Sequence, residues 1–331
     1  MFKYIVKRLL LAIIILLGVS FIVYALVRMM PMNYVETKYA AQLAQGTIKQ
    51  EDIDRFLDLY GLNSSIVGGY FTWLKGLLSG NLGNSFKYNR PVTDVITDYM
   101  WISFSIALVA TILQFLIAIP LGITSATHQY SVRDYTVTVL TMIGLSFPTY
   151  FFAAIVIKIF SVDLGWLPNS GLVDTSVSYA ANFAGQMHKF GDMAVHLIMP
   201  ILVSVVLSIG GLMRYTRTNT LEVLNADYIR TARAKGLSEH TVIYKHAFRN
   251  TLIPLATLLA GILPGLFGGM MITEEVFAID GIGRLAYLAL KDGDIPFVMG
   301  YNMFLAILTV IGTLLSDIMY AIVDPRVKLT K

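Results

Sequence analysis

Residues 227–237 read DYIRTARAKGL, a short cationic segment that lies between two long apolar runs of the chain. Asn225 or Asp227 can cap the start of a helix there, because a side-chain oxygen accepts hydrogen bonds from the first free backbone N–H groups. Gly236 can adopt the left-handed conformation that commonly ends a helix. Ser238 can start a second helix that runs into the next apolar stretch. The sequence therefore predicts a short helix, a glycine bend and a second helix.

The composition around this segment is that of a membrane protein. Of the 331 residues, 56% are hydrophobic and 14% are charged, and the mean hydropathy is +0.67. Soluble domains carry about 25% charged residues. Six apolar runs can cross roughly 30 Å of hydrocarbon as helices, namely Leu9–Val27, Trp101–Ile123, Tyr135–Phe160, Ala194–Met213, Leu252–Thr273 and Phe297–Val323. We therefore predict an all-α integral membrane protein with six transmembrane helices.

The first run, Leu9–Val27, follows three basic residues and could be read as a secretory signal. It is longer than the apolar core of a signal peptide, and no small-x-small cleavage site comes after it. We expect a retained span.

The distribution of charge orients the spans. If the N-terminus is cytoplasmic, the inner segments hold 14 basic and 5 acidic residues, whereas the outer segments hold 9 basic and 15 acidic ones. The inner segments are 1–8, 124–134, 214–250 and 324–331, and the outer ones are 31–98, 161–193 and 274–296. An excess of lysine and arginine marks the cytoplasmic side, so both termini are predicted inside. The net charge of +4 then reflects this face and gives no indication of nucleic-acid binding.

We divide the chain into four parts. Residues 1–30 are a tail and the first span, 31–98 an external helical insert, 99–323 a core of five spans that includes the cytoplasmic segment 214–250, and 324–331 a cytoplasmic tail. Apolar residues at helical spacing predict two amphipathic helices in the insert, at Ile53–Tyr60 before Gly61 and at Tyr70–Leu78 before Gly80. These helices either cover the outer ends of the spans or contact an external partner.

The outer segment 274–296 is acidic and contains glycine, with Glu274, Glu275, Asp280, Asp292 and Asp294. A solvated loop and a partner-contact loop both fit this composition.

Several kinds of chemistry have no motif in the chain. There is no phosphate-binding Gly-x-x-x-x-Gly-Lys-[Ser/Thr] loop and no His-Glu-x-x-His, and the five histidines are scattered. The absence of cysteine excludes disulfides and thiolate chemistry. We therefore expect no catalytic residue, no metal site and no cofactor in this chain.

The predicted spans contain one acid, Asp317. A structural ion pair with Arg326 or a cap is one interpretation of this residue, and a proton relay is the other. An ion-coupled transporter usually needs carboxylates or broken helices at mid-membrane. Neutral polar side chains dominate instead, and they either join helices or line a path for a solute. The path candidates are Gln114, Ser146, Ser204, Ser208 and Asn302. Pro148 should kink the third span, because it removes a helical hydrogen bond.

Short motifs follow one another along the chain in a specific order. They are Tyr4–Leu10, Gly18–Ser20, Tyr60–Leu62, Gly80–Ser85, Pro91–Val92, Trp166–Pro168, Asp227–Gly236, Lys245–Asn250 and Asp324–Arg326. The run Tyr228–Gly236 is the most specific of these motifs. Through them the chain resembles, over essentially its whole length, the B-type membrane subunit of oligopeptide and dipeptide ABC importers, a branch of the binding-protein-dependent permeases.

The resemblance implies a type I ABC importer permease fold in which a cytoplasmic coupling helix docks on an ATPase subunit. The residues implied in docking are Tyr228, Arg230, Thr231, Ala232, Arg233, Lys235 and Gly236. Arg230-Thr231-Ala232 stands where the wider group has Glu-Ala-Ala, so no particular salt bridge is assigned. The alternative reading of the cations is the cytoplasmic charge excess together with contact to anionic lipid.

The resemblance further implies a bacterial cytoplasmic membrane and a set of partners. These are a homologous second permease subunit, two ATPases that bind ATP and Mg²⁺, an external peptide-binding protein, peptide substrate and membrane lipid. Within the family, dipeptides, nickel chelates or glutathione are alternative solutes. Outside it, the alternatives are an ion-coupled secondary transporter and a membrane receptor or scaffold.

Overall fold

The computed structural model describes residues 2–29, scattered positions between 43 and 58, and residues 63–323. Within these ranges the chain forms helices and one isolated β-bridge between Asn84 and Pro91, which confirms the all-α class. Most residues of the predicted helix Ile53–Tyr60, and Gly61 after it, lie outside the described residues. The predicted tail 324–331 lies outside them entirely.

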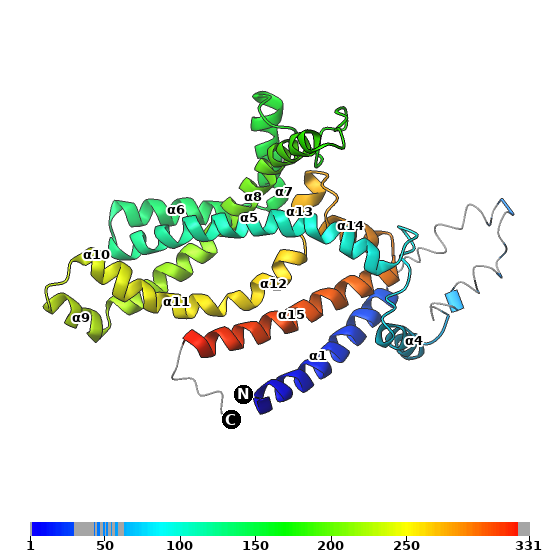
Figure 1. Cartoon of the computed structure of the whole chain (residues 1–331), viewed down its shortest axis with the longest axis horizontal. Coiled ribbons are helices and arrows are strands. Elements are labelled where there is room, and N and C mark those ends of the chain that lie inside the picture. Colours follow the sequence, from blue (N-terminus) through cyan, green and yellow to red (C-terminus); the bar gives the residue numbers. More distant parts are fainter. Residues whose placement is uncertain are drawn as a thin grey trace.

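The helices that can cross a membrane form the body of the molecule. In the described part of the chain, four helices are long and apolar enough over all or most of their length: α1 (Phe2–Arg28), α5 (Val92–Thr127), α8 (Phe183–Leu224) and α15 (Ile295–Val323). They contain the first, second, fourth and sixth predicted spans. Figure 1 shows α1 beside α15, and α1 begins on the same side of the molecule on which α15 ends.

The third predicted span is broken. α6 (Val132–Ser146) is followed by α7 (Thr149–Ile157) and the π-helical turn η1 (Lys158–Asp163), and the two halves meet at 100°. Phe147 and Pro148 are extended at the break, because proline disfavours a helical conformation in the residue before it. The prediction of a kink at Pro148 in the third span is confirmed.

The fifth predicted span, Leu252–Thr273, is also divided, into parts of α11 (Phe248–Thr257), α12 (Leu259–Phe267) and α13 (Met271–Val276). The chain passes through α10 (Glu239–Thr241) and the π-helical η2 (Val242–Ala247) before α11. Pro254 and Pro264 lie inside α11 and α12, and each lacks the backbone N–H of a regular helix. Gly269 has φ +75° between α12 and α13, a conformation that stops helical propagation.

The described part of the external insert packs on α1. α4 (Ile66–Leu78) confirms the second predicted helix, and the Ser65 side chain caps it by accepting from Gly68 N–H. The Tyr70 hydroxyl lies 2.9 Å from the Ser20 hydroxyl and 3.1 Å from the Leu17 carbonyl oxygen. This helix therefore covers part of the first span.

The acidic segment 274–296 is folded into the protein, so the prediction of a solvated loop is wrong. It forms the second half of α13 and all of α14 (Ile282–Lys291), and Glu274 and Asp294 are completely buried. The Asp294 carboxylate accepts hydrogen bonds from the Ser85 hydroxyl and the Lys87 N–H of the insert, and from the Phe297 N–H of α15. Ser85 and Lys87 lie more than 200 positions from Asp294 in the chain, which is why acidity alone did not indicate burial.

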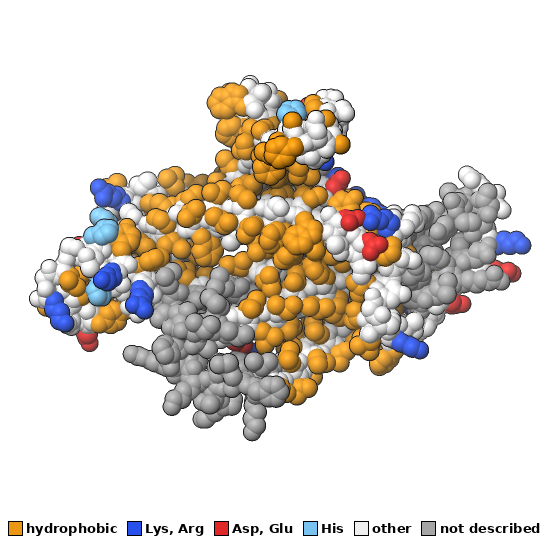
Figure 2. Space-filling model, in the orientation of Figure 1, with side chains coloured by type: hydrophobic (Ala, Val, Ile, Leu, Met, Phe, Trp, Pro, Cys, Tyr) orange, Lys and Arg blue, Asp and Glu red, His pale blue; other side chains and the backbone are white. Residues whose placement is uncertain are grey.

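The surface follows the charge pattern of the sequence. α9 (Asp227–Ala234) and α4 lie at opposite ends of the long axis (Figure 1). Hydrophobic side chains cover the middle of the visible face, and lysine, arginine and histidine gather at the α9 end (Figure 2). Apolar side chains exposed along helices of this length belong in lipid, so this is a multi-pass membrane protein.

Candidate functional site

The short helix α9 is built from local signals. Gly236 has φ +76° and donates its N–H to the Arg233 carbonyl at 2.9 Å, which confirms the predicted glycine bend. Ser238 caps the second helix by accepting from Thr241 N–H, as predicted. The start differs: Ala226 is the N-cap without a side-chain hydrogen bond, and Asn225 donates to Leu221 O in α8. The prediction of Asn225 or Asp227 as cap is wrong, and Asp227 instead complements the helix dipole from the first turn.

One face of α9 anchors it to the rest of the chain. Ile229 is fully buried and Ala232 nearly so, and both pack against Val242 and Ala247 of η2. Val223 and Leu224 at the end of α8 complete this cluster. The cluster joins α9 to the helix before it and to the helix after it, so α9 cannot shift independently of either.

The opposite face of α9 is exposed on the surface of the chain. Among the seven residues predicted to contact an ATPase, Ala232 faces inward, and the six exposed ones are Tyr228, Arg230, Thr231, Arg233, Lys235 and Gly236. Partial burial raises the pKa of the Tyr228 phenol above its usual value. The exposed face thus offers a phenol and three cations to whatever binds there.

Arg233 also forms an ion pair within the chain that joins α9 to the helix after it. Its guanidinium Nε lies 2.8 Å from Oε1 of Glu239, across the Gly236 bend. Both side chains are more than one-third exposed, and exposed ion pairs typically contribute about 0.2–1 kcal/mol.

We expect Arg233→Ala to lower the stability of the bend by less than about 1 kcal/mol. Thermal unfolding of the purified assembly checks this value. Glu239→Ala is the matched control, because it removes the same pair from the other side. A loss of transport in Arg233→Ala that Glu239→Ala does not share would assign Arg233 a contact outside this chain.

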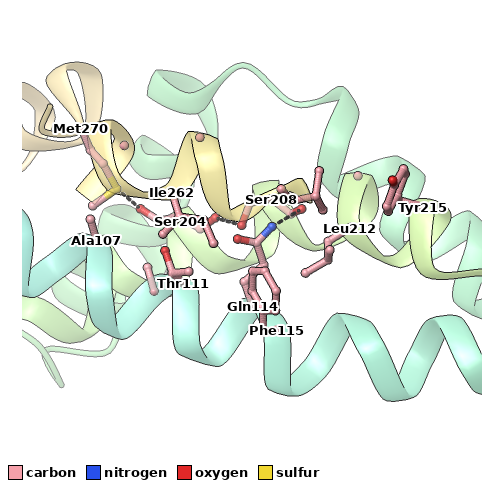
Figure 3. Close-up of a pocket in the computed structure, with 15 residues that line it drawn as sticks. Ala107, Thr111, Gln114, Phe115, Ser204, Ser208, Leu212, Tyr215, Ile262 and Met270 are labelled. Atoms are coloured by element: carbon pink, nitrogen blue, oxygen red, sulfur yellow. Dashed lines mark hydrogen bonds between the residues drawn. The ribbon is translucent and has the colours of Figure 1, made fainter. Parts of the chain in front are cut away.

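α9 connects the two walls of a cleft of about 550 Å³. One wall is formed by α5 and α8, and the other by Leu258, α12 and Met270 (Figure 3). The lining residues are Ala107, Ala110, Thr111, Gln114, Phe115, Ser204, Ser208, Gly211, Leu212, Tyr215, Leu258, Gly261, Ile262, Gly265 and Met270. Met270 lies at one end and Tyr215 at the other (Figure 3).

Three of the five predicted path residues meet in this cleft. Gln114 Nε2 donates to the Ser208 carbonyl at 3.1 Å, and the Ser208 and Ser204 hydroxyls donate to carbonyls one turn earlier in α8. Ser146 is instead exposed at the end of α6, where it donates to Met142 O. Asn302 lies in a separate small pocket between α1 and α15.

Sequence reasoning missed most of the apolar and glycine lining. A signal was present, because Ala107, Thr111 and Gln114 follow helical spacing on α5, and Ser204, Ser208 and Gly211 do so on α8. None of the lining side chains is charged. A Cβ added at Gly211, Gly261 or Gly265 would meet no heavy atom within 4 Å. Glycines therefore keep the cleft wide.

A buried ion pair joins α5, α6 and α8 near α9. Arg217 binds Asp134 in a bidentate manner, with Nε–Oδ1 at 2.9 Å and Nη2–Oδ2 at 2.8 Å. The Ser125 hydroxyl donates to the same carboxylate, and Tyr130 N–H reaches Oδ2 at 3.0 Å. The members lie in the last turn of α5, in the turn that follows it, in the first turn of α6 and in the C-terminal part of α8.

Glycine contacts tighten the same three helices. A Cβ at Gly122 of α5 would come within 2.8 Å of Met213 O, and a Cβ at Gly144 of α6 within 2.8 Å of Val206 O. Both partners are backbone atoms of α8, which cannot move aside cheaply. α5, α6 and α8 therefore form one rigid unit.

Asp317 takes part in an ion pair, as one of the predicted alternatives required. Its Oδ2 lies 3.3 Å from Arg8 Nε, so it ties α15 to α1. Arg326, suggested from the sequence as a partner, lies outside the described residues.

Comparison with known families identifies the family of this chain. Residues 118–329 match the family described as binding-protein-dependent transport system inner membrane component, and residues 1–107 match the N-terminal model of that group. The chain belongs to this family. The larger match includes α9.

Individual relatives of this inner membrane component cover its full length. It is 36% identical over 329 residues to the oligopeptide transport system permease protein AppB of Bacillus subtilis (strain 168), covering 99% of this chain and 100% of the relative. It is 33% identical over 337 residues to the dipeptide transport system permease protein DppB of Alkalihalophilus pseudofirmus, covering 99% and 100%.

A solved structure has a similar fold. The match is to the methionine ABC transporter MetNI in an inward-facing conformation, with TM-score 0.53 and 18% identity, and it covers 70% of this chain and 97% of that one. This inner membrane component therefore has the fold of a type I ABC importer permease.

Proposed function

We propose that this chain is the membrane-embedded permease subunit of an ATP-driven importer and forms half of the translocation path for oligopeptides. The observation that carries the proposal is the position of α9, which leads directly into α8 on one side and through η2 into α11 on the other. α8 forms part of one wall of the cleft, and α11 leads through Leu258 into α12, which forms part of the other wall. A displacement of α9 must therefore change the shape of the cleft.

The proposal requires partners that supply energy and solute. Two cytoplasmic ATPase subunits bind ATP and Mg²⁺, and they press on the exposed face of α9. A homologous second permease subunit forms the other half of the path, and an external binding protein delivers peptide. The chain itself is non-catalytic, needs no cofactor, and lies in the bacterial cytoplasmic membrane with both termini inside.

The proposed mechanism depends on a rigid group of helices on one side of the cleft and a wall with breaks on the other. α5, α6 and α8 move as one body, because the Asp134–Arg217 pair and close glycine contacts join them. The opposite wall has breaks at Leu258 and at Gly268–Met270, on either side of α12. Closure of the ATPases moves α9, the rigid unit tilts against α12, and the cleft alternates its access between the two sides of the membrane.

The lining of the cleft supports a peptide as solute. Its polar groups are neutral hydroxyls and one amide, which can bind backbone N–H and C=O groups regardless of peptide side chains. Oligopeptides are the first candidate and dipeptides the second, after the named relatives. Nickel chelates and glutathione stay as alternatives, and discrimination among peptides is assigned to the external binding protein.

We expect Gly211→Trp to reduce peptide uptake by at least about tenfold, because the indole enters the cleft where a Cβ meets open space. The matched control is Gly191→Trp, also in α8 and also facing open space, but outside the cleft. Uptake of labelled peptide into vesicles that contain the full assembly is the measurement. Peptide-stimulated ATP hydrolysis is recorded in parallel.

Normal uptake in Gly211→Trp at normal membrane abundance would exclude this cleft as the path. Full uptake by the purified chain without ATPase subunits would refute the proposal as a whole, and uptake driven by an ion gradient would identify a secondary transporter.

A further inference from the structure

A buried carboxylate outside the cleft has no part in the mechanism above. Glu274, in α13, is completely buried. Burial of a carboxylate is costly unless hydrogen bonds compensate for the lost water. In the described part of the chain, every partner recorded for this carboxylate is a hydrogen-bond donor, and all come from the outer half of the protein.

The donors to Glu274 converge from three segments. Oε1 accepts from the Ser103 hydroxyl of α5 at 2.7 Å and from Met270 N–H at 2.9 Å. Oε2 accepts from Arg284 N–H of α14 at 2.9 Å. Ser103 Oγ in turn accepts from Ile282 N–H at 2.9 Å. The carboxylate thus joins α5, α14 and the segment between α12 and α13.

Glycines let these segments close around the carboxylate. A Cβ at Gly281 would collide with the Glu274 carboxyl group, and a Cβ at Gly269 would collide with the backbone of Gly283. The surrounding segments therefore pack closely around the carboxylate, with no room for a larger residue at Gly281.

The segment that Glu274 holds is the outer end of the cleft. Met270 lines the cleft, and its sulfur accepts from the Ser204 hydroxyl at 3.1 Å. Beyond Met270 lies a packed core that includes Ile106, Phe277 and Ile279. The Tyr301 hydroxyl donates to Gly268 O. Met270 thus packs against a buried core at this end of the cleft.

We infer that Glu274 is the positioning residue of the outer closure of the cleft. It fixes the backbone of Met270 against α5 and α14, so the cleft opens outward only when this network shifts or breaks. The inference rests on the proposed function, because it treats the cleft as a path with an outer end. It concerns the geometry of the closure, and it can be tested without any transport.

The test uses a cysteine reporter in a chain that has no cysteine. Gly265→Cys places a thiol in the cleft at a site with no heavy atom within 4 Å. The full assembly, in right-side-out vesicles without nucleotide, is treated with a membrane-impermeant maleimide. We expect slow labelling with Glu274 intact and labelling at least about tenfold faster in Glu274→Gln. The amide NH₂ cannot accept a hydrogen bond, so at least one donor around the site loses its acceptor.

Glu275→Gln is the matched control. Glu275 is adjacent in sequence, but its carboxylate is 39% exposed and pairs with the Arg284 side chain at 2.9 Å. Labelling of the reporter should be unchanged in this variant. Labelling from inside-out vesicles is measured for every variant, which verifies that the reporter reacts and that the chain is inserted.

Unchanged outside labelling in an assembled Glu274→Gln transporter overturns the inference. If that variant does not accumulate in the membrane, Ser103→Ala is tested in its place. This change removes one donor to Glu274 and the acceptor of Ile282 N–H. Faster labelling in Ser103→Ala supports the inference, and unchanged labelling overturns it. A failure of peptide uptake in the parent protein would contradict the proposed function and would leave these labelling results readable.

Discussion

Gly236→Pro is expected to reduce ATP-driven uptake to background while the chain remains inserted in the membrane. Gly236 has φ +76°, whereas proline is fixed near φ −65°. Proline also lacks the N–H that Gly236 donates to Arg233 O. The bend between α9 and the second helix cannot form, so the exposed face of α9 no longer faces the ATPase in one orientation.

Two milder variants show whether the bend itself is responsible. Gly236→Asn should keep most of the uptake, because asparagine tolerates the left-handed conformation. Gly236→Ala should be intermediate, with a cost of about 1–2 kcal/mol, and nothing within 4 Å would meet its Cβ. Deletion of Ala232 and Arg233 should act like proline, since it removes a buried contact of α9.

Three quantities are measured on each variant, namely the amount of inserted chain, copurification with the ATPase subunits, and uptake per assembled complex. Copurification should fall with uptake in Gly236→Pro. Peptide uptake that survives in Gly236→Pro would show that α9 does not transmit the motion.

Arg217→Met is expected to destabilise the assembled permease by about 3–5 kcal/mol, the usual cost of leaving one partner of a buried ion pair alone. The Asp134 carboxylate is 5% exposed and the Arg217 side chain 24%. Without Arg217, the charge of Asp134 keeps the Ser125 hydroxyl and Tyr130 N–H but has no cation. The rigid unit of α5, α6 and α8 then loses the ion pair that joins its helices at the end nearest α9.

The double variant Asp134→Leu with Arg217→Met should be more stable than Arg217→Met alone, because no buried charge is left unpaired. Arg214→Met is the matched control. It lies one turn earlier in α8, is exposed, and contacts the sulfur of Met142. Thermal unfolding of the purified assembly reports stability, and the number of ATP molecules hydrolysed per peptide reports coupling.

We expect the double variant to recover stability without full recovery of coupling. A hydrophobic pair can fill the space, but it lacks the directional contact between the start of α6 and α8. Equal unfolding temperatures for Arg217→Met and Arg214→Met would contradict the role assigned to this ion pair.

Much of the fold was predictable, because its signals are local. Helical spacing with a terminal glycine predicts α4, Gly236 with Ser238 predicts the bend after α9, and Pro148 predicts the break after α6. Apolar length predicts α1, α5, α8 and α15. The same measure failed between Leu252 and Thr273, since composition counts apolar residues but does not show where prolines and Gly269 divide the helix.

The site was predictable only in part. Gln114, Ser204 and Ser208 were selected as neutral polar residues within spans, a criterion that also selects Ser146 and Asn302. What separates the two groups is the direction of each side chain relative to other helices. Ala232 shows the same limit on α9, because its position in the motif does not reveal that it faces Val242 and Ala247.

The sequence by itself determined that this is a membrane protein and where the short cationic helix α9 lies. Each of these depends on composition or on residues a few positions apart. Only the tertiary structure decided which polar groups are buried together. Ser103 and Glu274, or Asp134 and Arg217, are far apart in the chain, and the cost of burying each charge is offset only when folding brings its partner within hydrogen-bond distance.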